Sequence, residues 1–273
     1  MDERPRLREV IIRHGLDARK SLGQHFLLDE NLTARIVRAA GPLAGRHVIE
    51  VGPGPGGLTR ALLQTEVSEV VAIEIDPRAV APIAELAVAE ARLRIVEADA
   101  MRVDAASLCA APRQIIANLP YNVGTPLLVG WLRQAAAFER LTLMFQQEVA
   151  ERICAKASSS DYGRLSVLAQ WTCEARIALR IPPSAFVPRP KVDSAIVVLT
   201  PHTLQPDPAL FNAMERITSA AFGQRRKMLR RSLKPVGGER LLAAAGIDPT
   251  RRAETLTVAE FERLAVALSA SVE

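Results

Sequence analysis

The chain has few of the residues that metal centres and disulfide frameworks need. Its 273 residues include four histidines and three cysteines, Cys109, Cys154 and Cys173, with no CxxC pair. An odd and sparse set of thiols differs from the disulfide frameworks of secreted proteins, so we expect a reducing cytoplasm as its location. With so few histidines and no paired cysteines, we expect no metal site.

Long apolar runs are also missing. No uninterrupted apolar stretch approaches the roughly 20 residues that a membrane-spanning helix needs. The opening stretch, MDERPRLREVIIRHG, is charged and contains no apolar signal core. We therefore expect neither membrane insertion nor an export signal.

The composition is that of an ordinary globular protein. Hydrophobic residues make up 49% and charged residues 24% of the chain, which excludes wholesale disorder. The net charge of +5 permits a polyanionic partner without requiring one. The length allows one large domain, or one domain with a small appendage.

Short runs rich in valine and isoleucine alternate with helix-length segments, which predicts an α/β fold with a mostly parallel, doubly wound sheet. After a helix-like entry over residues 1–20, Asp29 is expected to cap a helix that runs to about Ala40. The segment 182–190 is too short for a crossover helix, so we expect the last two strands to be antiparallel. The expected helices include Pro77–Glu90, Pro126–Ala136 and Gln146–Ala155. The expected strands are His47–Val51, Glu69–Ile75, Leu93–Glu97, Gln114–Asn118, Leu141–Phe145, Ala175–Ile181 and Ser194–Thr200.

The pattern changes near Pro201–Pro208, where the chain is polar and rich in proline like a linker. Beyond it the β-branched runs end and helical periodicities continue. We predict a catalytic domain over residues 1–205 and a small all-helical domain over residues 206–273.

A glycine loop, VIEVGPGPGGLT, follows the first expected strand and precedes a helix. Gly52, Gly54 and Gly57 fit the G-x-G-x-x-G pattern of nucleotide sites, where glycine lets the backbone approach a ligand. A tight strand–helix turn without a ligand would use the same residues. The loop alone is therefore weak evidence for a binding site.

Two acids end the next two expected strands. Glu74 is placed to accept hydrogen bonds from ribose hydroxyls, and Asp99 to accept one from an adenine amine. Asp76, which precedes Pro77, is better suited to capping the next helix. Because the carboxyl ends of parallel strands meet at one sheet edge, we expect a nucleoside there. These residues leave NAD and S-adenosylmethionine as alternatives.

The fourth expected strand ends in Asn118-Leu119-Pro120-Tyr121. This tetrapeptide resembles the [N/D/S]-P-P-[Y/F/W] motif of amino methyltransferases and so favours S-adenosylmethionine. The Asn118 side chain and the Leu119 carbonyl can accept the two N6 hydrogens of adenine, which frees the nitrogen lone pair for methylation. Pro120 holds the backbone, and Tyr121 offers a face on which a flipped base stacks. Catalysis would depend on positioning the adenine and on polarising its N6 amine through hydrogen bonds, without a strong general base.

The chain as a whole resembles the small-subunit (16S) ribosomal RNA adenine N6,N6-dimethyltransferases of the KsgA/RsmA type. The resemblance implies an S-adenosylmethionine-dependent methyltransferase with a Rossmann-like, mostly parallel seven-stranded sheet and a terminal antiparallel strand. It implies dimethylation of two adjacent adenosines in the 3′-terminal hairpin of small-subunit RNA, late in subunit assembly. Separately, we expect a monomer. The matching stretches are SLGQHFLLD, EVGPGPGGLT, NLPYNVGTPLL, YGRLSVLAQ with FVPRPKVDSAIV, and FGQRRKMLRRSL with GIDPTRRAETLTVAEF.

The same resemblance implies site residues. His25 stands where the family often has asparagine, and a role in helix entry or packing is its alternative. Phe186 would stack on the base face opposite Tyr121, although a buried phenylalanine in a proline-rich connector would show the same pattern. The implied cofactor contacts are His25, Leu27, Gly52, Gly54, Glu74, Asp99, Ala100 and Asn118.

The stretch FGQRRKMLRRSLK holds basic residues with no acid among them. If it is helical, Arg226 and Arg230 are neighbours, as are Lys227 and Arg231. Such a cluster can contact RNA phosphates, and a solvated charged face is the alternative. The expected RNA contacts are Arg225, Arg226, Lys227, Arg230, Arg231 and, in the FVPRPKVDSA loop, Lys191.

Three other functions remain as alternatives. The related dimethylases that confer macrolide resistance on large-subunit RNA share the cofactor fold and the NLPY chemistry. A binding protein that uses this fold for assembly or transcription would not need an intact NLPY site. A DNA adenine methyltransferase would need a separate target-recognition region, and none is apparent.

Overall fold

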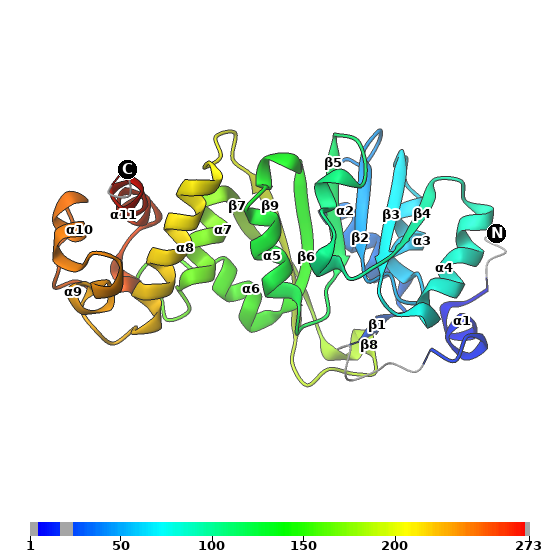
Figure 1. Cartoon of the computed structure of the whole chain (residues 1–273). Helices are drawn as coiled ribbons and strands as arrows, with labels where there is room; N and C mark the ends of the chain where they lie inside the picture. Colours follow the sequence, from blue (N-terminus) through cyan, green and yellow to red (C-terminus); the bar gives the residue numbers. More distant parts are fainter. Residues whose placement is uncertain (1–4, 17–23, 271–273) are drawn as a thin grey trace. The chain divides into compact units, whose positions relative to one another are not determined.

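The computed structural model describes residues 5–16 and 24–270 (Figure 1). The chain divides into two compact units, one formed by Met1–Ala150 with Arg176–Thr200, the other by Glu151–Ala175 with Pro201–Glu273. The predicted boundary at 205/206 therefore differs from this division in one segment, Glu151–Ala175, which groups with the C-terminal helices. The functional division into 1–205 and 206–273 stays a prediction.

The large sheet has seven strands in the order β4-β3-β2-β5-β6-β9-β7 (Figure 1). Neighbours from β4 to β6 run parallel, whereas β9 runs antiparallel to β6, with Leu199 opposite Leu141. This confirms the predicted α/β class with its mostly parallel sheet. The strands are β2 (His47–Val51), β3 (Glu69–Glu74), β4 (Leu93–Glu97), β5 (Arg113–Asn118), β6 (Arg140–Gln146), β7 (Cys173–Ile181) and β9 (Ser194–Pro201).

Two aspartates begin helices of the first unit as predicted. Asp29 accepts the N–H groups of Asn31 and Leu32, at 2.9 and 3.2 Å, and Asp76 accepts that of Arg78 at 3.2 Å. Such side chains satisfy donors that have no partner within the helix. The helices that begin in this unit are α1 (Leu7–Arg13), α2 (Glu30–Ala39), α3 (Gly57–Leu63), α4 (Pro77–Ala89), α5 (Gly124–Leu132) and α6 (Gln147–Ile153).

One hydrophobic cluster joins α2, α3 and α4 to one face of the sheet. Ile36, Leu62 and Ile83 from the helices are at most 1% exposed, and they belong to the same cluster as Val70 and Ile116 of β3 and β5. At roughly 25 cal/mol per Å² of buried apolar surface, such packing is the main force that holds the strands in place. It thereby fixes the sheet edge at which β2, β3, β4 and β5 end.

A second, two-stranded sheet pairs segments far apart in the sequence. β1 (Phe26–Leu27) runs antiparallel to β8 (Phe186–Val187), with Phe26 opposite Val187 (Figure 1). Strands of two residues are too short to carry a periodic pattern, so the sequence did not predict them. The pairing brings the QHFLL and FVPRP stretches together.

The second unit contains α7 (Arg164–Thr172), α8 (Pro208–Gly223), α9 (Leu229–Ser232), α10 (Gly238–Ala244) and α11 (Val258–Ala270). Trp171 of α7 packs against Phe211 of α8, with ring centroids 5.9 Å apart, and its Nε1 donates to Glu262 of α11 at 3.2 Å. These contacts explain why the segment 151–175 groups with the C-terminal helices. No helix in the described ranges is long and apolar enough to cross a membrane.

The FGQRRKMLRRSLK stretch is not one continuous helix, so the condition under which Arg226 and Arg230 would be helical neighbours is not met. α8 ends at Gly223, residues 224–226 form a turn, Lys227 is a bend, and α9 begins only at Leu229. The cause is tertiary: Met228 is extended and pairs with Arg252, and the N–H of Leu229 donates to the Arg251 carbonyl at 2.7 Å. The basic residues are therefore not neighbours through i,i+4 helical spacing.

Candidate active site

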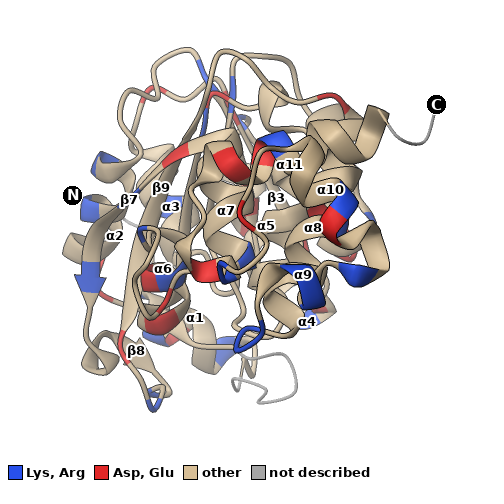
Figure 2. Ribbon diagram, turned by 90° about the vertical axis from the view of Figure 1, so that its left-hand side faces the viewer, with Lys and Arg blue, Asp and Glu red and all other residues tan. Residues whose placement is uncertain are grey.

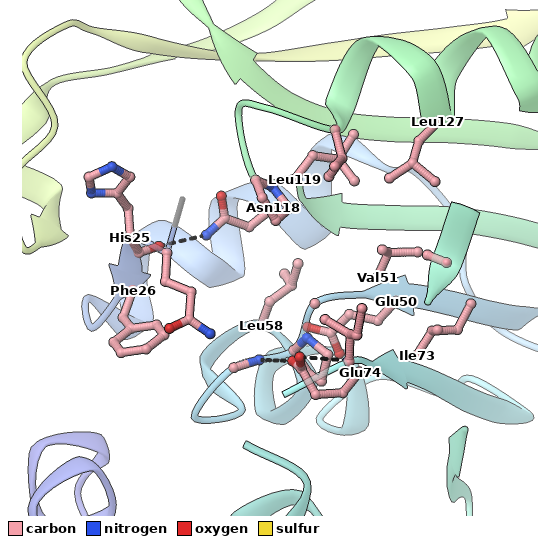
Figure 3. Close-up of a pocket in the computed structure, with 18 of the residues that line it drawn as sticks. His25, Phe26, Glu50, Val51, Leu58, Ile73, Glu74, Asn118, Leu119 and Leu127 are labelled. Carbon is pink, nitrogen blue, oxygen red and sulfur yellow. Dashed lines mark hydrogen bonds between the residues drawn. The ribbon is translucent and has the colours of Figure 1, made fainter. Parts of the chain in front are cut away.

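A cavity of about 240 Å³ lies at the sheet edge where β2, β3, β4 and β5 end (Figure 3). Each of these strands is followed by residues that line it, and a fifth segment, Gln24–Leu27, completes the wall. The structure thus brings together most of the residues predicted from the sequence: His25, Leu27, Gly52, Gly54, Glu74, Asp99, Ala100, Asn118, Leu119, Pro120 and Tyr121.

The glycine loop needs its glycines for backbone geometry. Gly52 and Gly54 have φ values of 70° and 54°, in the left-handed region that other residues rarely adopt. At Gly57 a Cβ would lie 2.6 Å from the Leu27 carbonyl oxygen, too close for any side chain. The loop therefore closes tightly over the segment around β1, and it keeps its own backbone next to the cavity.

Glu74 is only 4% exposed, yet it lines the cavity. Its carboxylate, which Figure 3 shows in the cavity wall, accepts the N–H groups of Gly54, Ile75 and Asp76 at 3.3, 2.9 and 2.8 Å. Burial raises the pKa of Glu74, and these hydrogen bonds oppose the rise. Because each carboxylate oxygen has two lone pairs, the group can still accept a hydrogen bond from a ligand hydroxyl.

Glu50 is a site residue that the sequence reasoning missed. It belongs to β2, is 1% exposed and lines the cavity, and its Oε2 has no hydrogen-bond partner among the described residues. Burial raises the pKa of Glu50 to about 8; the nearby Glu74 adds to the rise and Thr59 opposes it. The available signal was an acid inside the otherwise apolar run VIEV.

Asp99 follows β4 at the edge of the cavity. Its Oδ1 accepts the N–H of Met101 at 2.9 Å, at the start of the short turn Ala100–Arg102. Ile75 and Met101 also line the cavity and are 54% and 47% exposed, which is high for large apolar side chains. They offer an apolar surface for a flat ligand between the two acids, and the sequence had not singled them out.

Asn118 is oriented by a hydrogen bond to the segment before β1. Its Nδ2 donates to the His25 carbonyl at 3.0 Å (Figure 3). This bond determines which end of the Asn118 amide is nitrogen and which is oxygen, because only the nitrogen can donate to a carbonyl. No hydrogen bond to the Oδ1 is found among the described residues, so this oxygen can accept one from a substrate amine in the cavity.

His25 also connects the two stretches that β1 and β8 bring together. Its Nδ1 lies 2.8 Å from the Pro188 carbonyl oxygen, and its ring centroid is 5.4 Å from that of Tyr121. The predicted His25 is thus a link between the NLPY and FVPRP loops. Ser21 to Gly23, in the same SLGQHFLLD stretch, lie outside the described residues.

The remaining predicted site residues lie outside the cavity. Phe186 is 1% exposed and packs in the core, with its ring 6.4 Å from that of His25, and Lys191 is exposed on the loop after β8. The other predicted basic residues, from Arg225 to Arg231, belong to the second unit. The stacking role of Phe186 and the RNA contacts stay predictions. Across residues 5–16 and 24–270, no cluster of three or more His, Cys, Asp or Glu side chains fits a metal ion.

The residues of the cavity fit a nucleoside-containing sulfonium cofactor. Glu74 presents a carboxylate acceptor, the glycine loop exposes backbone beside it, and Ile75 and Met101 supply an apolar surface near Asp99. Asn118, at the next strand end, presents an amide oxygen to a substrate amine. This set is suited to transferring a methyl group to a nitrogen.

The known proteins that this chain resembles agree with that chemistry. A family model for ribosomal RNA adenine dimethylases matches residues 15–269. The ribosomal RNA small subunit methyltransferase A of Gluconobacter oxydans is 66% identical over 262 residues, covering 96% of this chain and 86% of the relative. Its counterpart in Paramagnetospirillum magneticum is 59% identical over 272 residues, covering 99% of this chain and 97% of the relative.

Two solved structures extend the comparison. A dimethyladenosine transferase from Plasmodium falciparum superposes with a TM-score of 0.73 at 25% identity, covering 88% of this chain and 96% of the other. The 23S rRNA methyltransferase ErmE superposes with a TM-score of 0.66 at 27% identity, covering 89% of this chain and 99% of ErmE. With the matched family model and the cavity described above, these similarities show that the chain is an S-adenosyl-L-methionine-dependent methyltransferase that belongs to the ribosomal RNA adenine dimethylase family.

Proposed function

We propose that this protein transfers methyl groups from S-adenosylmethionine to N6 of two adjacent adenosines in the 3′-terminal hairpin of small-subunit (16S) ribosomal RNA. The observation that carries the proposal is the orientation of Asn118, whose amide nitrogen is bound by His25 so that its oxygen faces a substrate amine. The relatives at 66% and 59% identity are named as small-subunit enzymes, whereas ErmE, a 23S enzyme, is 27% identical. This difference favours small-subunit RNA over large-subunit RNA.

When bound, S-adenosylmethionine supplies a methyl group on a positively charged sulfur. Glu74 would hold the ribose hydroxyls, Asp99 the adenine amine, and the glycine loop would lie beside the rest of the cofactor. The other proposed contacts to the cofactor are His25, Leu27, Ala100 and Asn118.

The tetrapeptide from Asn118 to Tyr121 would hold the target adenine. The Asn118 oxygen and the Leu119 carbonyl accept the two N6 hydrogens, which localises the lone pair on N6. Tyr121 would stack on one face of the base, and Phe186 is the proposed contact for the opposite face. Such an arrangement accelerates the reaction by positioning and hydrogen bonding.

We propose that the helical part, residues 206–273, contacts the RNA while residues 1–205 carry out catalysis. Arg226, Lys227, Arg230 and Arg231 are exposed, and no ion pair involves them in the part of the chain that the structure describes. Figure 2 shows the blue of basic residues on α9. Together with Arg225 and Lys191 they would neutralise phosphates. The enzyme would act as a cytoplasmic monomer, late in small-subunit assembly.

Parallel incubations with labelled S-adenosylmethionine would test the substrate assignment. Undermethylated small subunits, large subunits and adenine-rich DNA are offered separately, and the modified base is mapped. We expect label on two adjacent adenosines of the small-subunit RNA and background levels elsewhere. Equal or greater labelling of large subunits or DNA would overturn the proposal.

Replacing Glu74 by alanine is expected to weaken the binding of S-adenosylmethionine by at least about tenfold. The variant loses a charged acceptor for the ribose, and hydrogen bonds to charged groups contribute about 1.5–3 kcal/mol each. Isothermal titration calorimetry measures the affinity directly. Glu66→Ala, which removes an exposed glutamate that precedes β3, is the matched control and should bind normally. Unchanged affinity in Glu74→Ala would refute the ribose assignment.

The double charge reversal Arg226→Glu/Arg230→Glu is expected to weaken binding to small-subunit RNA and to flatten its salt dependence. For each phosphate that the variant no longer neutralises, the slope of log K against log salt concentration should fall in magnitude by about 0.7–0.9. The control is Arg216→Glu/Arg240→Glu, which makes the same charge change at exposed positions of α8 and α10. An unaltered slope in the first variant, or an equal change in both variants, would show that the 225–231 segment is a solvated surface that does not contact RNA.

A further inference from the structure

Ser194 is a buried hydroxyl that contacts the NLPY tetrapeptide from another part of the chain. It is 0% exposed and is the first residue of β9, paired with Gln146 at the end of β6. The neighbouring Asp193 carbonyl accepts the N–H of Gln147 at 2.9 Å. The backbone that carries Ser194 is therefore held in place by the sheet.

The hydroxyl of Ser194 lies 2.7 Å from the phenolic oxygen of Tyr121. Tyr121 is half-buried and lines the cavity, and it follows β5 in a loop. On its other side the His25 ring is tilted by 32° relative to it, at a centroid distance of 5.4 Å. Tyr121 is thus contacted at its hydroxyl by Ser194 and along its ring by His25.

We infer that Ser194 is a positioning residue for methyl transfer: its hydroxyl holds the Tyr121 ring in the plane on which the target adenine stacks. The inference rests on the proposed role of Tyr121 as a stacking surface. A half-buried aromatic side chain in a loop can turn about its side-chain bonds, and stacking geometry depends on the plane of the ring. Anchoring the far end of the ring to a rigid strand removes this freedom before the base arrives.

The bond has a distinct effect on the tyrosine itself. Burial raises the pKa of Tyr121, and the hydrogen bond with Ser194 lowers it. The chain contains two tyrosines, Tyr121 and Tyr162, so the signal of Tyr121 can be assigned by replacing the other one. A change in the hydrogen bonding of Tyr121 is therefore measurable without reference to activity.

The test compares Ser194→Ala, Tyr121→Phe and the double variant with wild type, using small subunits and S-adenosylmethionine. We expect each single variant to lower kcat by about three- to tenfold, the range expected from the loss of one neutral hydrogen bond. KM for the subunit and the affinity for S-adenosylmethionine should stay within about twofold, because phosphate and cofactor contacts are untouched. The double variant should be no slower than Tyr121→Phe, because both remove the same bond.

Thr142→Val is the matched control. Thr142 lies on the neighbouring β6, is 0% exposed and has no hydrogen-bond partner for its hydroxyl in the described part of the chain. It should keep wild-type kcat, which would show that loss of a buried hydroxyl from this sheet does not by itself slow the reaction.

Nuclear magnetic resonance of ¹³Cζ-labelled tyrosine supplies the second readout, with Tyr162→Phe for assignment. We expect Ser194→Ala to shift the Tyr121 signal and Thr142→Val to leave it in place. Wild-type kcat in Ser194→Ala, an unshifted Tyr121 signal, or a fully additive loss in the double variant would each overturn the inference. If wild-type protein itself fails to methylate small subunits, the proposed function falls instead, so the two failures are distinguishable.

Discussion

Asn118→Ala is expected to lower the rate of methyl transfer to small-subunit RNA by about 100- to 1000-fold. The amide nitrogen of Asn118 donates to the His25 carbonyl, and no described residue donates to the amide oxygen, which is the proposed acceptor for the substrate amine. In other enzymes, removing one preorganised hydrogen-bonding group from the active site lowers kcat by about 100- to 1000-fold. Single-turnover kinetics with labelled S-adenosylmethionine measures the chemical step.

The affinity of Asn118→Ala for S-adenosylmethionine should stay within about threefold, because Glu74 and the glycine loop are retained. Asn31→Ala, an exposed asparagine of α2, is the matched control for the substitution itself and should retain wild-type rates. A wild-type rate in Asn118→Ala would contradict the assigned role. A loss of rate matched by an equal loss of cofactor affinity would move Asn118 from catalysis to binding.

Glu50→Gln is expected to stabilise the cofactor-free protein, and the gain should grow as pH rises. Glu50 is 1% exposed, and burial raises its pKa from the ordinary 4.5 to about 8. Below about pH 4.5 the group is protonated in both the folded and the unfolded state, so it adds no pH dependence there. Between pH 4.5 and about pH 8, Glu50 is ionised in the unfolded chain but protonated in the folded protein. The free energy of unfolding of the wild type therefore falls as pH rises through this range.

The difference between variant and wild type should therefore increase from about pH 5 and level off above about pH 8, reaching about 3–5 kcal/mol. Urea unfolding at a series of pH values measures it. Glu74, whose negative charge raises the pKa of Glu50, is present in both proteins. The difference between them therefore measures the cost of the Glu50 charge, including its repulsion by Glu74. Glu97→Gln, an exposed glutamate of the same sheet, should follow the wild-type curve. A constant difference across the pH range would show that Glu50 is ionised when buried.

The long strands and the strand-end residues were predictable from the sequence. Runs such as HVIEV and EVVAIE are apolar enough to be read as buried parallel strands, and their carboxyl ends must share one edge. The positions of Gly52, Glu74, Asp99 and Asn118 around one cavity follow from that geometry alone. The helix caps Asp29 and Asp76 were predictable as well, because capping depends on local sequence.

Other features depend on residues that meet only in the folded protein. The basic residues of segment 225–231 have helical spacing. They do not form one helix, because residues 228–230 pair with residues 249–252 instead. Glu50 resembles a strand residue, and only its burial next to Glu74 identifies it as a perturbed acid. In both cases a tertiary contact overrides what the local pattern indicates.

The sequence by itself determined the class of this protein, since local periodicity and the order of its strand-end motifs specify a sheet edge that binds a cofactor. Only the tertiary structure decided how the substrate side of the cavity is built. The two-residue pairing of β1 with β8 brings His25 to Pro188 and Asn118, and the β6–β9 ladder brings Ser194 to Tyr121. These partners lie between 73 and 163 residues apart. Contacts at such separations leave no periodic signal in the sequence and exist only once the sheet has folded.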